Sequence, residues 1–386
     1  MKRVRVLRII TRLNIGGPAI HTVLLTAQID QSIFQTKLVA GEIQKHEYDM
    51  GYFAKKYNVD PFYITGLKRD ISFSRDIFSI FKLYRIMRTY KPDIIHTHTA
   101  KAGFVGRIAG FLAGIKIIIH TFHGNIFSGY FNKLKSSFFI KLEKVLSLIS
   151  TKIIALSKQQ KRELIDLKIA KCNKISIIQL GFDFNNILPS SSDKNKFKSR
   201  YNIPENSKLI GIIGRLTHIK NHDLFIQIAE RLLDKYDNIY FPIIGDGELK
   251  DELQESINNR GLHKYVFITG FIKDLKPVYA DLDAVVLTSL NEGTPVAIIE
   301  SMAALKLVCC TDVGGISDFI ENGVDGFYFD KYIPDPFVDF LSNWIENPSS
   351  YKDIPTKASK KAIETFNESR LIKDIENLYL ECLKHQ

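Results

Sequence analysis

The sequence predicts an α/β protein built from two doubly wound, Rossmann-like domains. Short apolar segments that favour strands alternate with longer amphipathic segments that favour helices, an order typical of parallel sheets. This alternation restarts after the polar stretch 189–194. The length of 386 residues also exceeds what one hydrophobic core commonly organises. We therefore expect one domain at residues 1–183, a second at residues 184–365, and a C-terminal helical segment at residues 366–386.

The first domain begins with a strand, a glycine-rich turn and a helix. Residues 4–11 alternate in hydropathy like a strand, and Gly16-Gly17-Pro18 precedes a helix from about residue 19 to residue 29. Apolar runs then predict four strands, and amphipathic spacing predicts a helix between them. The strands are expected at 37–40, 93–96, 116–120 and 152–156, and the helix at 77–90.

The second domain repeats this order and ends in an amphipathic helix. Strands are expected at 209–214, 239–244, 266–269, 284–287 and 307–310, a helix at 223–233, and the final helix at 368–384.

The charge is unevenly distributed between the two halves. The net charge is +11, but residues 1–183 hold 30 Lys and Arg against 12 Asp and Glu, whereas the rest holds 23 against 30. A basic first half favours an anionic substrate or an anionic membrane surface. Residues 129–144 mix aromatic side chains with lysines, which suits a membrane interface or an ordinary amphipathic helix. No nucleic-acid recognition module accompanies the basic charge, so nucleic acid is not an expected partner.

Compartment signals point to the cytoplasm. Residues 1–10 carry positive charges but lack the continuous apolar core of a signal peptide, and no apolar run reaches the roughly 18 residues of a membrane span. The four cysteines show no metal-binding spacing, and Cys309 and Cys310 lie in an apolar strand, as expected of buried thiols in a reducing compartment.

Two acids near one predicted helix start are the most informative feature for function. Glu292 lies in a polar turn that follows an apolar strand. Seven residues separate it from Glu300, which lies in an apolar helix. That helix is expected to begin near Pro295, after Gly293 and Thr294. Backbone N–H groups at a helix start bind phosphate, and flanking carboxylates accept hydrogen bonds from hydroxyls. The segment therefore suits a nucleotide sugar. A helix cap and a solvated helix position are the alternative roles for the two acids.

Cations and glycines follow other strands at the edge where doubly wound domains bind ligands. Arg215 comes directly after Gly214, and Lys220 lies five residues further on. Arginine offers a fork for phosphate oxygens and lysine a compact charge, although a solvated surface pair is the alternative. Gly245 opens a tight loop whose backbone suits a ligand, and Asp246 is expected to cap the next helix.

The first domain offers weaker candidates. Gly16 and Gly17 fit either a phosphate-approach loop or a plain turn. His123, followed by Gly124, fits either a hydrogen-bonding role at a ligand or a satisfied core histidine.

Metal binding is not expected from this sequence. The pairs His96 with His98 and His120 with His123 lack the further ligands that a metal site needs. Asp281-Leu282-Asp283 has an acidic spacing seen in metal–nucleotide sites, but helix-end and turn roles explain it more simply.

Together these motifs resemble the retaining GT-B glycosyltransferases of family 4, which include many capsule, O-antigen and lipopolysaccharide enzymes. The resemblance covers nearly the whole chain and implies the GT-B fold, with two Rossmann-like domains facing across a cleft and the last helix returning to the first domain. The Glu-x7-Glu element is its strongest motif. The others, in the family's order, are Gly16-Gly17, His123-Gly124, Gly214-Arg215 with Lys220, Gly245-Asp246-Gly247 and Asp312-Val313-Gly314-Gly315.

The resemblance implies a role for each motif. Arg215 and Lys220 would hold the donor diphosphate, and Glu300 would accept hydrogen bonds from the ribose hydroxyls. Glu292 would contact donor-sugar hydroxyls, and His123 the transferred sugar near its reacting carbon. The other implied donor-binding residues are Gly16, Gly17, Gly214 and Gly245 near the phosphates, Thr269, Gly270 and Phe271 near the base, and the loop of Gly293, Thr294, Pro295 and Val296 through its backbone.

The chain departs from the family pattern at two positions. Asn221 stands where glycine often follows the lysine, and Asp318 stands where glutamate is common after the paired glycines. Asparagine can cap the next helix, so little loss is expected from the first change.

These features predict a retaining hexosyl- or N-acetylhexosaminyl-transferase that uses a nucleotide sugar, with a UDP-sugar as the expected donor, and that needs neither a cofactor nor a metal. The expected acceptor is a glycan or a polyprenyl-diphosphate-linked sugar in surface polysaccharide biosynthesis. The expected location is the cytoplasm, with peripheral attachment to the inner face of the plasma membrane. The rival hypotheses are a nucleotide-sugar epimerase or hydrolase of the same architecture, and a non-catalytic sugar-nucleotide-binding subunit.

Overall fold

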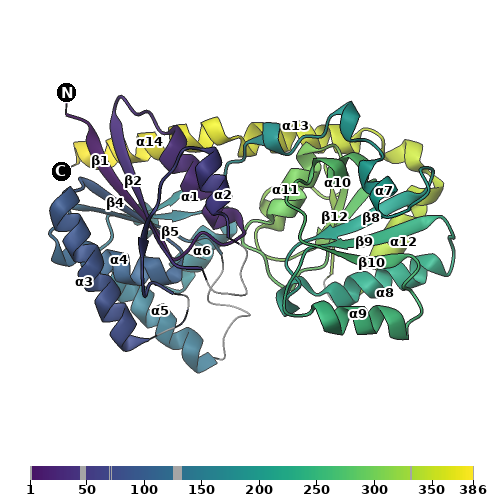
Figure 1. The fold of residues 1–386 in the computed structure, drawn as a ribbon, viewed down its shortest axis with the longest axis horizontal. Helices are drawn as coiled ribbons and strands as arrows, with labels where there is room; N and C mark the ends of the chain where they lie inside the picture. Colours follow the sequence, from purple (N-terminus) through teal and green to yellow (C-terminus); the bar gives the residue numbers. More distant parts are fainter. Residues whose placement is uncertain are drawn as a thin grey trace. The chain divides into compact units, whose positions relative to one another are not determined.

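The structure is a computed structural model that describes residues 2–43, 49–68, 70, 72–124, 133–330 and 333–385. It divides into two compact units. Unit 1 comprises Met1–Phe182 together with Phe366–Gln386, and unit 2 comprises Asp183–Thr365. Each unit holds one sheet covered by helices (Figure 1). The two sheets are parallel and wound in both directions from a central strand, so the predicted α/β fold class is confirmed.

Unit 1 contains a seven-stranded sheet in the order β3-β2-β1-β4-β5-β6-β7. Its strands are rich in isoleucine, leucine and valine, whose branched side chains pack well on a pleated surface. The strands are β1 (Val4–Ile10), β2 (Phe34–Gly41), β3 (Phe62–Ile64), β4 (Ile94–His98), β5 (Ile117–Thr121), β6 (Lys152–Ala155) and β7 (Ile175–Ile177). The helices are α1 (Gly17–Gln28), α2 (Gly51–Lys56), α3 (Phe73–Tyr90), α4 (Ala100–Leu112), α5 (Lys133–Leu148), α6 (Lys158–Asp166) and the returning α14 (Glu368–Lys384).

Helices cover both faces of this sheet (Figure 1). On one face, α14 buries Leu371, Ile375 and Tyr379 against β1, β4 and β5. On the other face, α3 buries Leu83 and Met87 with α4 against β1, β2 and β4. Because α14 follows unit 2 in the chain but packs in the core of unit 1, the C-terminal segment belongs structurally to the first unit.

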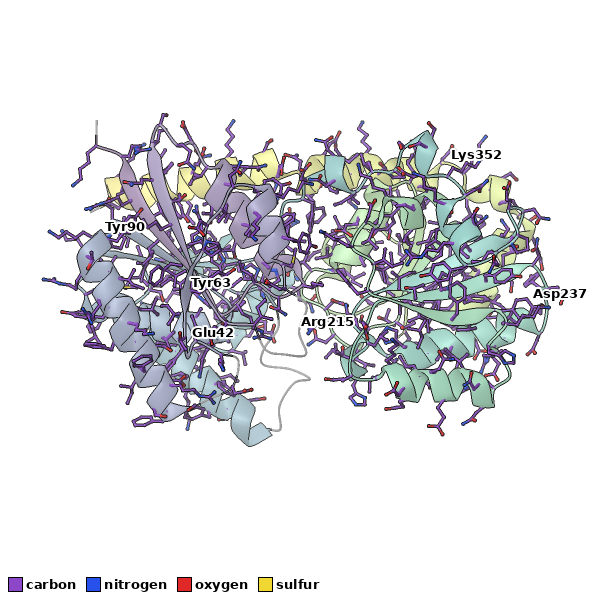
Figure 2. The ribbon with its side chains drawn as sticks, viewed as in Figure 1. Glu42, Tyr63, Tyr90, Arg215, Asp237 and Lys352 are labelled. Atoms are coloured by element: carbon purple, nitrogen blue, oxygen red, sulfur yellow. The ribbon has the colours of Figure 1, made fainter. Side chains whose placement is uncertain are left out.

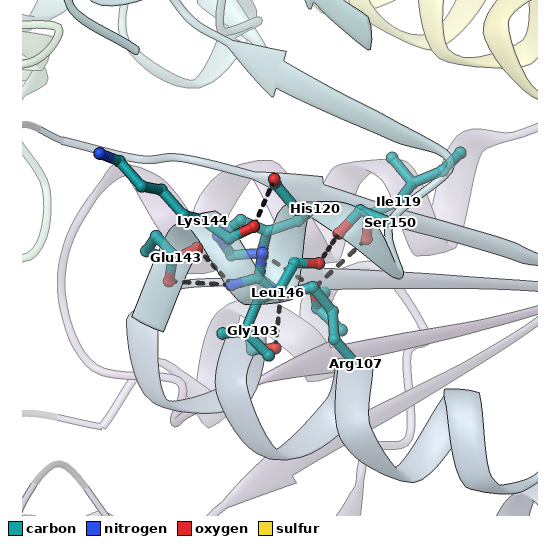
Figure 3. A network of polar contacts seen from close by, with 10 residues as sticks. Gly103, Arg107, Ile119, His120, Glu143, Lys144, Leu146 and Ser150 are labelled. Atoms are coloured by element: carbon teal, nitrogen blue, oxygen red, sulfur yellow. Dashed lines mark hydrogen bonds and ion pairs between the residues drawn. The ribbon is translucent and has the colours of Figure 1, made fainter. Parts of the chain in front are cut away.

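A buried ion pair joins two of the helices on the second face (Figure 3). Arg107 of α4 is completely buried, and one of its terminal nitrogens donates to both carboxylate oxygens of Glu143 on α5, at 2.9 and 2.7 Å. The Nε of Arg107 donates to the carbonyl oxygen of Gly103 at 2.8 Å. The pair therefore fixes α5 against α4.

The aromatic–lysine segment predicted at 129–144 is described only in part. Residues 125–132 lie outside the described residues. From Ser136 onwards, α5 is an amphipathic helix that buries Glu143, Leu146 and Ser147 and exposes Phe138, Val145 and Leu148.

Unit 2 contains a six-stranded sheet in the order β10-β9-β8-β11-β12-β13. Its core lies between the strands and helices α8, α9 and α12. The strands are β8 (Lys208–Ile213), β9 (Ile239–Ile244), β10 (Val266–Gly270), β11 (Ala284–Leu287), β12 (Leu307–Thr311) and β13 (Phe327–Phe329). The helices are α7 (Lys196–Arg200), α8 (His222–Leu233), α9 (Lys250–Asn259), α10 (Lys276–Asp281), α11 (Val296–Ala303), α12 (Asp335–Glu346) and α13 (Ile354–Phe366).

Every strand predicted from an apolar run is present within about three residues of its predicted ends. Three strands were missed, namely β3, β7 and β13. Each has three residues and lies at the edge of its sheet. Such short segments give no readable period, and edge strands need less apolar surface than central ones.

The cysteine interpretation agrees with the structure. Cys309 and Cys310 are buried thiols in β12, and all four cysteines are free. Among the described residues, no helix is both long and apolar enough to cross a membrane.

Candidate active site

The strongest candidates in unit 2 lie at the carboxyl edge of its sheet. Gly214 and Arg215 directly follow β8, and Lys220 ends a single 3₁₀ turn that leads into α8. Arg215, labelled in Figure 2, is exposed and makes no ion pair with the described residues. The Lys220 side chain lies beside Gly214, where a Cβ would stand 3.4 Å from the lysine Cε. The carboxyl edge of the sheet thus carries the Arg215 guanidinium, which has no ion-pair partner among the described residues, and the Lys220 side chain, which lies against Gly214.

Lys220 and Glu292 form an ion pair across 72 residues of sequence. The lysine Nζ lies 2.5 Å from Oε1 of Glu292, and the Ser289 hydroxyl donates to the same oxygen. The Thr288 hydroxyl donates to the carbonyl oxygens of Lys220 and Asn221, at 3.0 and 2.9 Å. The end of β11 therefore holds both the acid and the loop that carries the lysine.

The backbone conformation at position 221 explains why asparagine is tolerated there. Its φ of 49° is in the left-handed region, which glycine and asparagine adopt more readily than other residues. The predicted capping role is partly wrong, because Asn221 occupies the N-cap of α8 without a side-chain hydrogen bond to that helix. Asparagine tolerates this conformation, which explains why it can stand where the family resemblance led us to expect glycine.

Two glycines allow a close approach of backbone segments at this edge. Gly314 has a φ of 59°, and a Cβ there would lie 1.8 Å from the carbonyl oxygen of Glu292. Gly245 has a φ of 153°, and a Cβ there would lie 1.8 Å from the carbonyl oxygen of Gly214. Neither space admits a side chain, so these glycines set the positions of the Glu292 and Arg215 loops.

Replacing Gly314 with alanine is expected to displace the Glu292 loop and to weaken nucleotide binding. The destabilisation should be roughly 2–4 kcal/mol, since backbone strain and a clash with main-chain atoms act together. Gly323→Ala is the matched control, because its φ is 81° but a Cβ there meets nothing within 4 Å. Urea unfolding should show a loss of only about 1 kcal/mol for the control. Equal losses for the two variants would contradict the proposed clash.

Glu300 is a buried acid on α11 with one identified partner. The Tyr279 hydroxyl of α10 donates to its Oε2 at 2.8 Å. Burial raises the pKa of the Glu300 carboxyl to about 7, while the tyrosine hydrogen bond lowers it in part. The solvated-position alternative is therefore wrong for Glu300, which is only 8% exposed.

The raised pKa of Glu300 predicts a pH-dependent stability. Between about pH 4.5 and pH 7 the folded state binds more protons at this carboxyl than the unfolded state, so the free energy of unfolding falls as pH rises. The loss is complete above pH 7 and is on the order of 3 kcal/mol. Glu300→Gln should remove this pH dependence. The free energy of unfolding of the variant should therefore rise relative to that of the parent as the pH is raised from 5 to 8. If urea unfolding gave the same difference in stability between variant and parent at pH 5 and at pH 8, the assignment would be contradicted.

The loop between the two acids ends at a helix start. Pro295 is the N-cap of α11, one residue before the first turn predicted for it, and Val296 is the first helical residue. Gly293 and Thr294 precede the cap in an irregular segment. As at any helix start, the first N–H groups have no acceptor within the helix, and they face an anion favourably.

The residues implied for the nucleotide base lie at the end of strand β10. Thr269 and Gly270 end β10, and Phe271 follows them. The carbonyl oxygen of Gly270 accepts a hydrogen bond from the Gly245 N–H at 3.1 Å, which joins this strand end to the Gly245 loop.

The acids of Asp281-Leu282-Asp283 have structural roles. Asp281 accepts hydrogen bonds from the N–H groups of Asn195, Phe197 and Lys198 at 2.6–2.9 Å and so caps α7. Asp283 accepts from the Leu209 N–H at 2.7 Å. The helix-end and turn interpretation of this segment is confirmed.

In unit 1, the glycine-rich turn begins a helix. Gly16 is the N-cap of α1 with a φ of 149°, and Gly17 is its first residue, with Pro18 next. The turn thus leads from the carboxyl edge of β1 into a helix start, a geometry that fits both a plain turn and a phosphate-approach loop.

His123 belongs to a cluster of three histidines at the same edge of unit 1. His123 Nε2 lies 3.0 Å from Nδ1 of His98, which ends β4. The His21 ring of α1 meets His123 edge-on with centroids 5.0 Å apart. Burial lowers the pKa of His123 to about 3, and it also lowers the pKa of His21 and His98 well below the usual value. All three imidazoles are therefore neutral at physiological pH. His98 and His123 can orient each other as donor and acceptor, whereas neither ring nitrogen of His21 has a hydrogen-bond partner among the described residues.

Two other histidines are buried in the core and contact side-chain hydroxyls. His96 lies 2.7 Å from the Tyr379 hydroxyl of α14 through Nδ1 and 2.7 Å from the Thr121 hydroxyl through Nε2. His120 Nδ1 lies 2.9 Å from the Thr97 hydroxyl. The cluster around His123 thus rests on a buried polar layer that reaches α14.

The three histidines also offer ring nitrogens within 4.8 Å of one another, a spacing that a metal could use. The group contains imidazoles only. The buried Arg8 guanidinium lowers the pKa of His21 and His98, and the same positive charge disfavours a bound cation. The surroundings therefore fit neutral imidazoles better than a bound cation.

The structure places the predicted residues in two groups. Gly16, Gly17 and His123 lie in unit 1. The others lie in unit 2, on neighbouring strand ends and on α11, and are Gly214, Arg215, Lys220, Gly245, Thr269, Gly270, Phe271, Glu292, Gly293, Thr294, Pro295, Val296 and Glu300. Sequence reasoning missed His21, His98, Tyr279 and Ser289 as partners of these residues. Only His98 carried a usable signal, as a histidine two residues beyond the end of the strand predicted at 93–96.

Comparison with known proteins agrees with this arrangement. Residues 15–186 match the family described as Glycosyltransferase Family 4, and residues 193–361 match Glycosyl transferases group 1. The chain is 28% identical to a UDP-Gal:alpha-D-GlcNAc-diphosphoundecaprenol alpha-1,3-galactosyltransferase of Escherichia coli, over 84% of this chain and 85% of the relative. It is 27% identical to the capsular polysaccharide biosynthesis glycosyltransferase CapM of Staphylococcus aureus, over 86% of this chain and 87% of that protein.

The fold has counterparts among solved structures. HepE of Anabaena in complex with UDP and glucose superposes with a TM-score of 0.85 at 20% identity, over 98% of this chain and all of that one. A sucrose-phosphate synthase of Thermosynechococcus elongatus also gives 0.85, at 14% identity. Together, the two matched halves and the two-sheet architecture show that the chain belongs to the family 4 glycosyltransferases with the GT-B fold.

Proposed function

We propose that this glycosyltransferase moves a hexosyl or N-acetylhexosaminyl residue from a UDP-sugar to a glycan or polyprenyl-diphosphate-linked acceptor, with retention of the anomeric configuration, in surface polysaccharide biosynthesis. The observation that carries the proposal is the Lys220–Glu292 ion pair beside the exposed Arg215. These residues would supply two cations for a diphosphate and one acid for sugar hydroxyls at a single sheet edge. The names of the Escherichia coli and Staphylococcus aureus relatives support the donor and pathway classes.

The chemistry requires charge stabilisation above all. The bond from the anomeric carbon to UDP breaks, a bond to an acceptor hydroxyl forms, and that hydroxyl loses its proton. Negative charge grows on the departing diphosphate, and Arg215, Lys220 and the start of α11 would stabilise it. Glu292 would orient the sugar hydroxyls, and Glu300 would accept hydrogen bonds from the ribose. His123, oriented by His98, would contact the transferred sugar.

The proposed reaction needs no metal ion or other cofactor. Arg215 and Lys220 supply the positive charge that a metal would otherwise bring to the diphosphate. The two acids of the Asp-x-Asp segment, Asp281 and Asp283, already accept backbone hydrogen bonds and are engaged in structure.

The proposed location is the cytoplasm, at the inner face of the plasma membrane. A polyprenyl-diphosphate acceptor is held in a bilayer, and an acceptor-binding first domain with 30 cations against 12 acids suits an anionic surface.

A thermal-shift screen of nucleotide sugars, followed by transfer assays, tests the proposal. A cognate UDP-sugar should raise the melting temperature, because a ligand that binds only the folded state stabilises it. Transfer to a lipid-linked acceptor in excess chelator, with the product's anomeric configuration read by NMR, should then show retention without metal. Donor consumption without acceptor would favour an epimerase or hydrolase, and binding without turnover a non-catalytic subunit; either result would overturn the proposal.

A further inference from the structure

The exposed aromatic side chains of this protein are concentrated in unit 1. Every phenylalanine and tyrosine among the exposed large hydrophobic residues of the described structure belongs to that unit, whereas unit 2 exposes only aliphatic ones. The densest group lies on α3. Phe73, Ile77, Phe78 and Phe81 are 82%, 51%, 48% and 55% exposed. Exposed apolar side chains grouped in this way mark an interaction surface.

These four residues occupy the outer face of α3. They recur at helical spacing, whereas Leu83 and Met87 on the opposite face pack in the core of unit 1. The helix is therefore apolar on two faces, and the protein's own core uses only one of them. Since α3 lies between two parallel strands, β3 and β4, its first turns lie at the carboxyl edge of the sheet, the edge that also carries His98 and His123.

The charges of α3 select an anionic occupant. The helix carries four cations, Arg75, Lys82, Arg85 and Arg88, and a single acid. That acid, Asp76, is buried and forms an ion pair with Lys101 of α4 at 2.5 Å, so it does not offset the outer face. Two cations lie over the exposed rings: Lys82 Nζ is 4.5 Å from the Phe78 centroid, and the Arg85 guanidinium carbon is 5.9 Å from that of Phe81.

We propose that the outer face of α3, which we call the α3 surface (Phe73, Ile77, Phe78 and Phe81 with Arg75, Lys82, Arg85 and Arg88), docks unit 1 on an anionic lipid bilayer. Aromatic rings enter the boundary between headgroups and acyl chains, and the neighbouring cations contact lipid phosphates. A convex helix face with cations beside its rings suits a bilayer, which needs no matching shape. This inference rests on the proposed function, because docking would bring the carboxyl edge of the sheet of unit 1, which carries His98 and His123, close to a lipid-linked acceptor.

The experiment is vesicle flotation with the full chain. Vesicles of phosphatidylcholine alone are compared with vesicles that also contain phosphatidylglycerol. The parent protein should float with the anionic vesicles only. Phe78→Ser with Phe81→Ser should lower the partition coefficient at least about tenfold, and Arg85→Gln with Arg88→Gln about fivefold for each charge removed. Leu305→Ser with Ile333→Ser, which removes two exposed apolar side chains of unit 2, should leave it unchanged.

Three results would overturn the inference. They are failure of the parent to bind anionic vesicles, equal losses in the α3 and control variants, and self-association of the parent in light scattering that the phenylalanine variants abolish. Circular dichroism and melting temperature verify folding, since the replaced side chains are exposed. Stabilisation by UDP-sugar should survive in the α3 variants. Its absence in the parent would contradict the proposed function and not the docking surface, so the two failures are distinguishable.

Discussion

Replacing Arg215 and Lys220 together with alanine is expected to lower kcat/KM for glycosyl transfer by at least about 10³-fold. Removing a single group that stabilises developing negative charge typically costs 10²–10³-fold, and here both cations at the sheet edge are removed. Arg215 is exposed and makes no ion pair with described residues, and Lys220 is paired only within the site, so the variant should fold. Steady-state kinetics with the cognate UDP-sugar measures the effect.

A charge-matched control separates this effect from the general field of the protein. Lys235→Ala with Lys250→Ala removes the same two charges from exposed positions of unit 2 and should change kcat/KM by less than about threefold. Donor turnover that survives in the Arg215 and Lys220 variant would show that these cations do not hold the diphosphate.

Replacing Glu143 with alanine is expected to destabilise unit 1 by roughly 3–5 kcal/mol, because it leaves the completely buried Arg107 guanidinium without its carboxylate. This exceeds the effect of most single substitutions. Urea unfolding followed by circular dichroism measures it. The loss should appear without a change in the Arg215 and Lys220 site, since Glu143 lies in the other unit.

Two further variants test whether the unpaired charge is the cause. Glu230→Ala breaks the more exposed Arg260–Glu230 pair and should cost less than about 1 kcal/mol. Arg107→Met combined with Glu143→Leu removes both charges and should recover most of the stability, because an apolar pair of similar volume has no charge to desolvate. A double variant as unstable as Glu143→Ala would point to lost packing instead.

Local patterns were sufficient to predict the elements that build the two cores. The central strands were predictable because most are apolar runs that are buried on both faces, while β1 alternates in hydropathy. The helix α14 was predicted at its observed bounds because its apolar stripe is clear. The strand-end residues Arg215, Lys220 and Glu292 were also predictable, since ligands bind where parallel strands end. The short edge strands β3, β7 and β13 were not, because three residues give no period.

By itself, the sequence determined the fold class, the family and which candidate residues lie at the carboxyl edge of the second sheet, because these depend on periodicity and on motifs within one segment. Only the tertiary structure decided which side chains meet. His21, His98 and His123 come from three elements, and Glu300 finds Tyr279 on another helix. It also decided which face of α3 is buried, since the two apolar faces of this helix have the same period. Folding buries one of them and leaves the other exposed, and that choice depends on the neighbouring helices and strands.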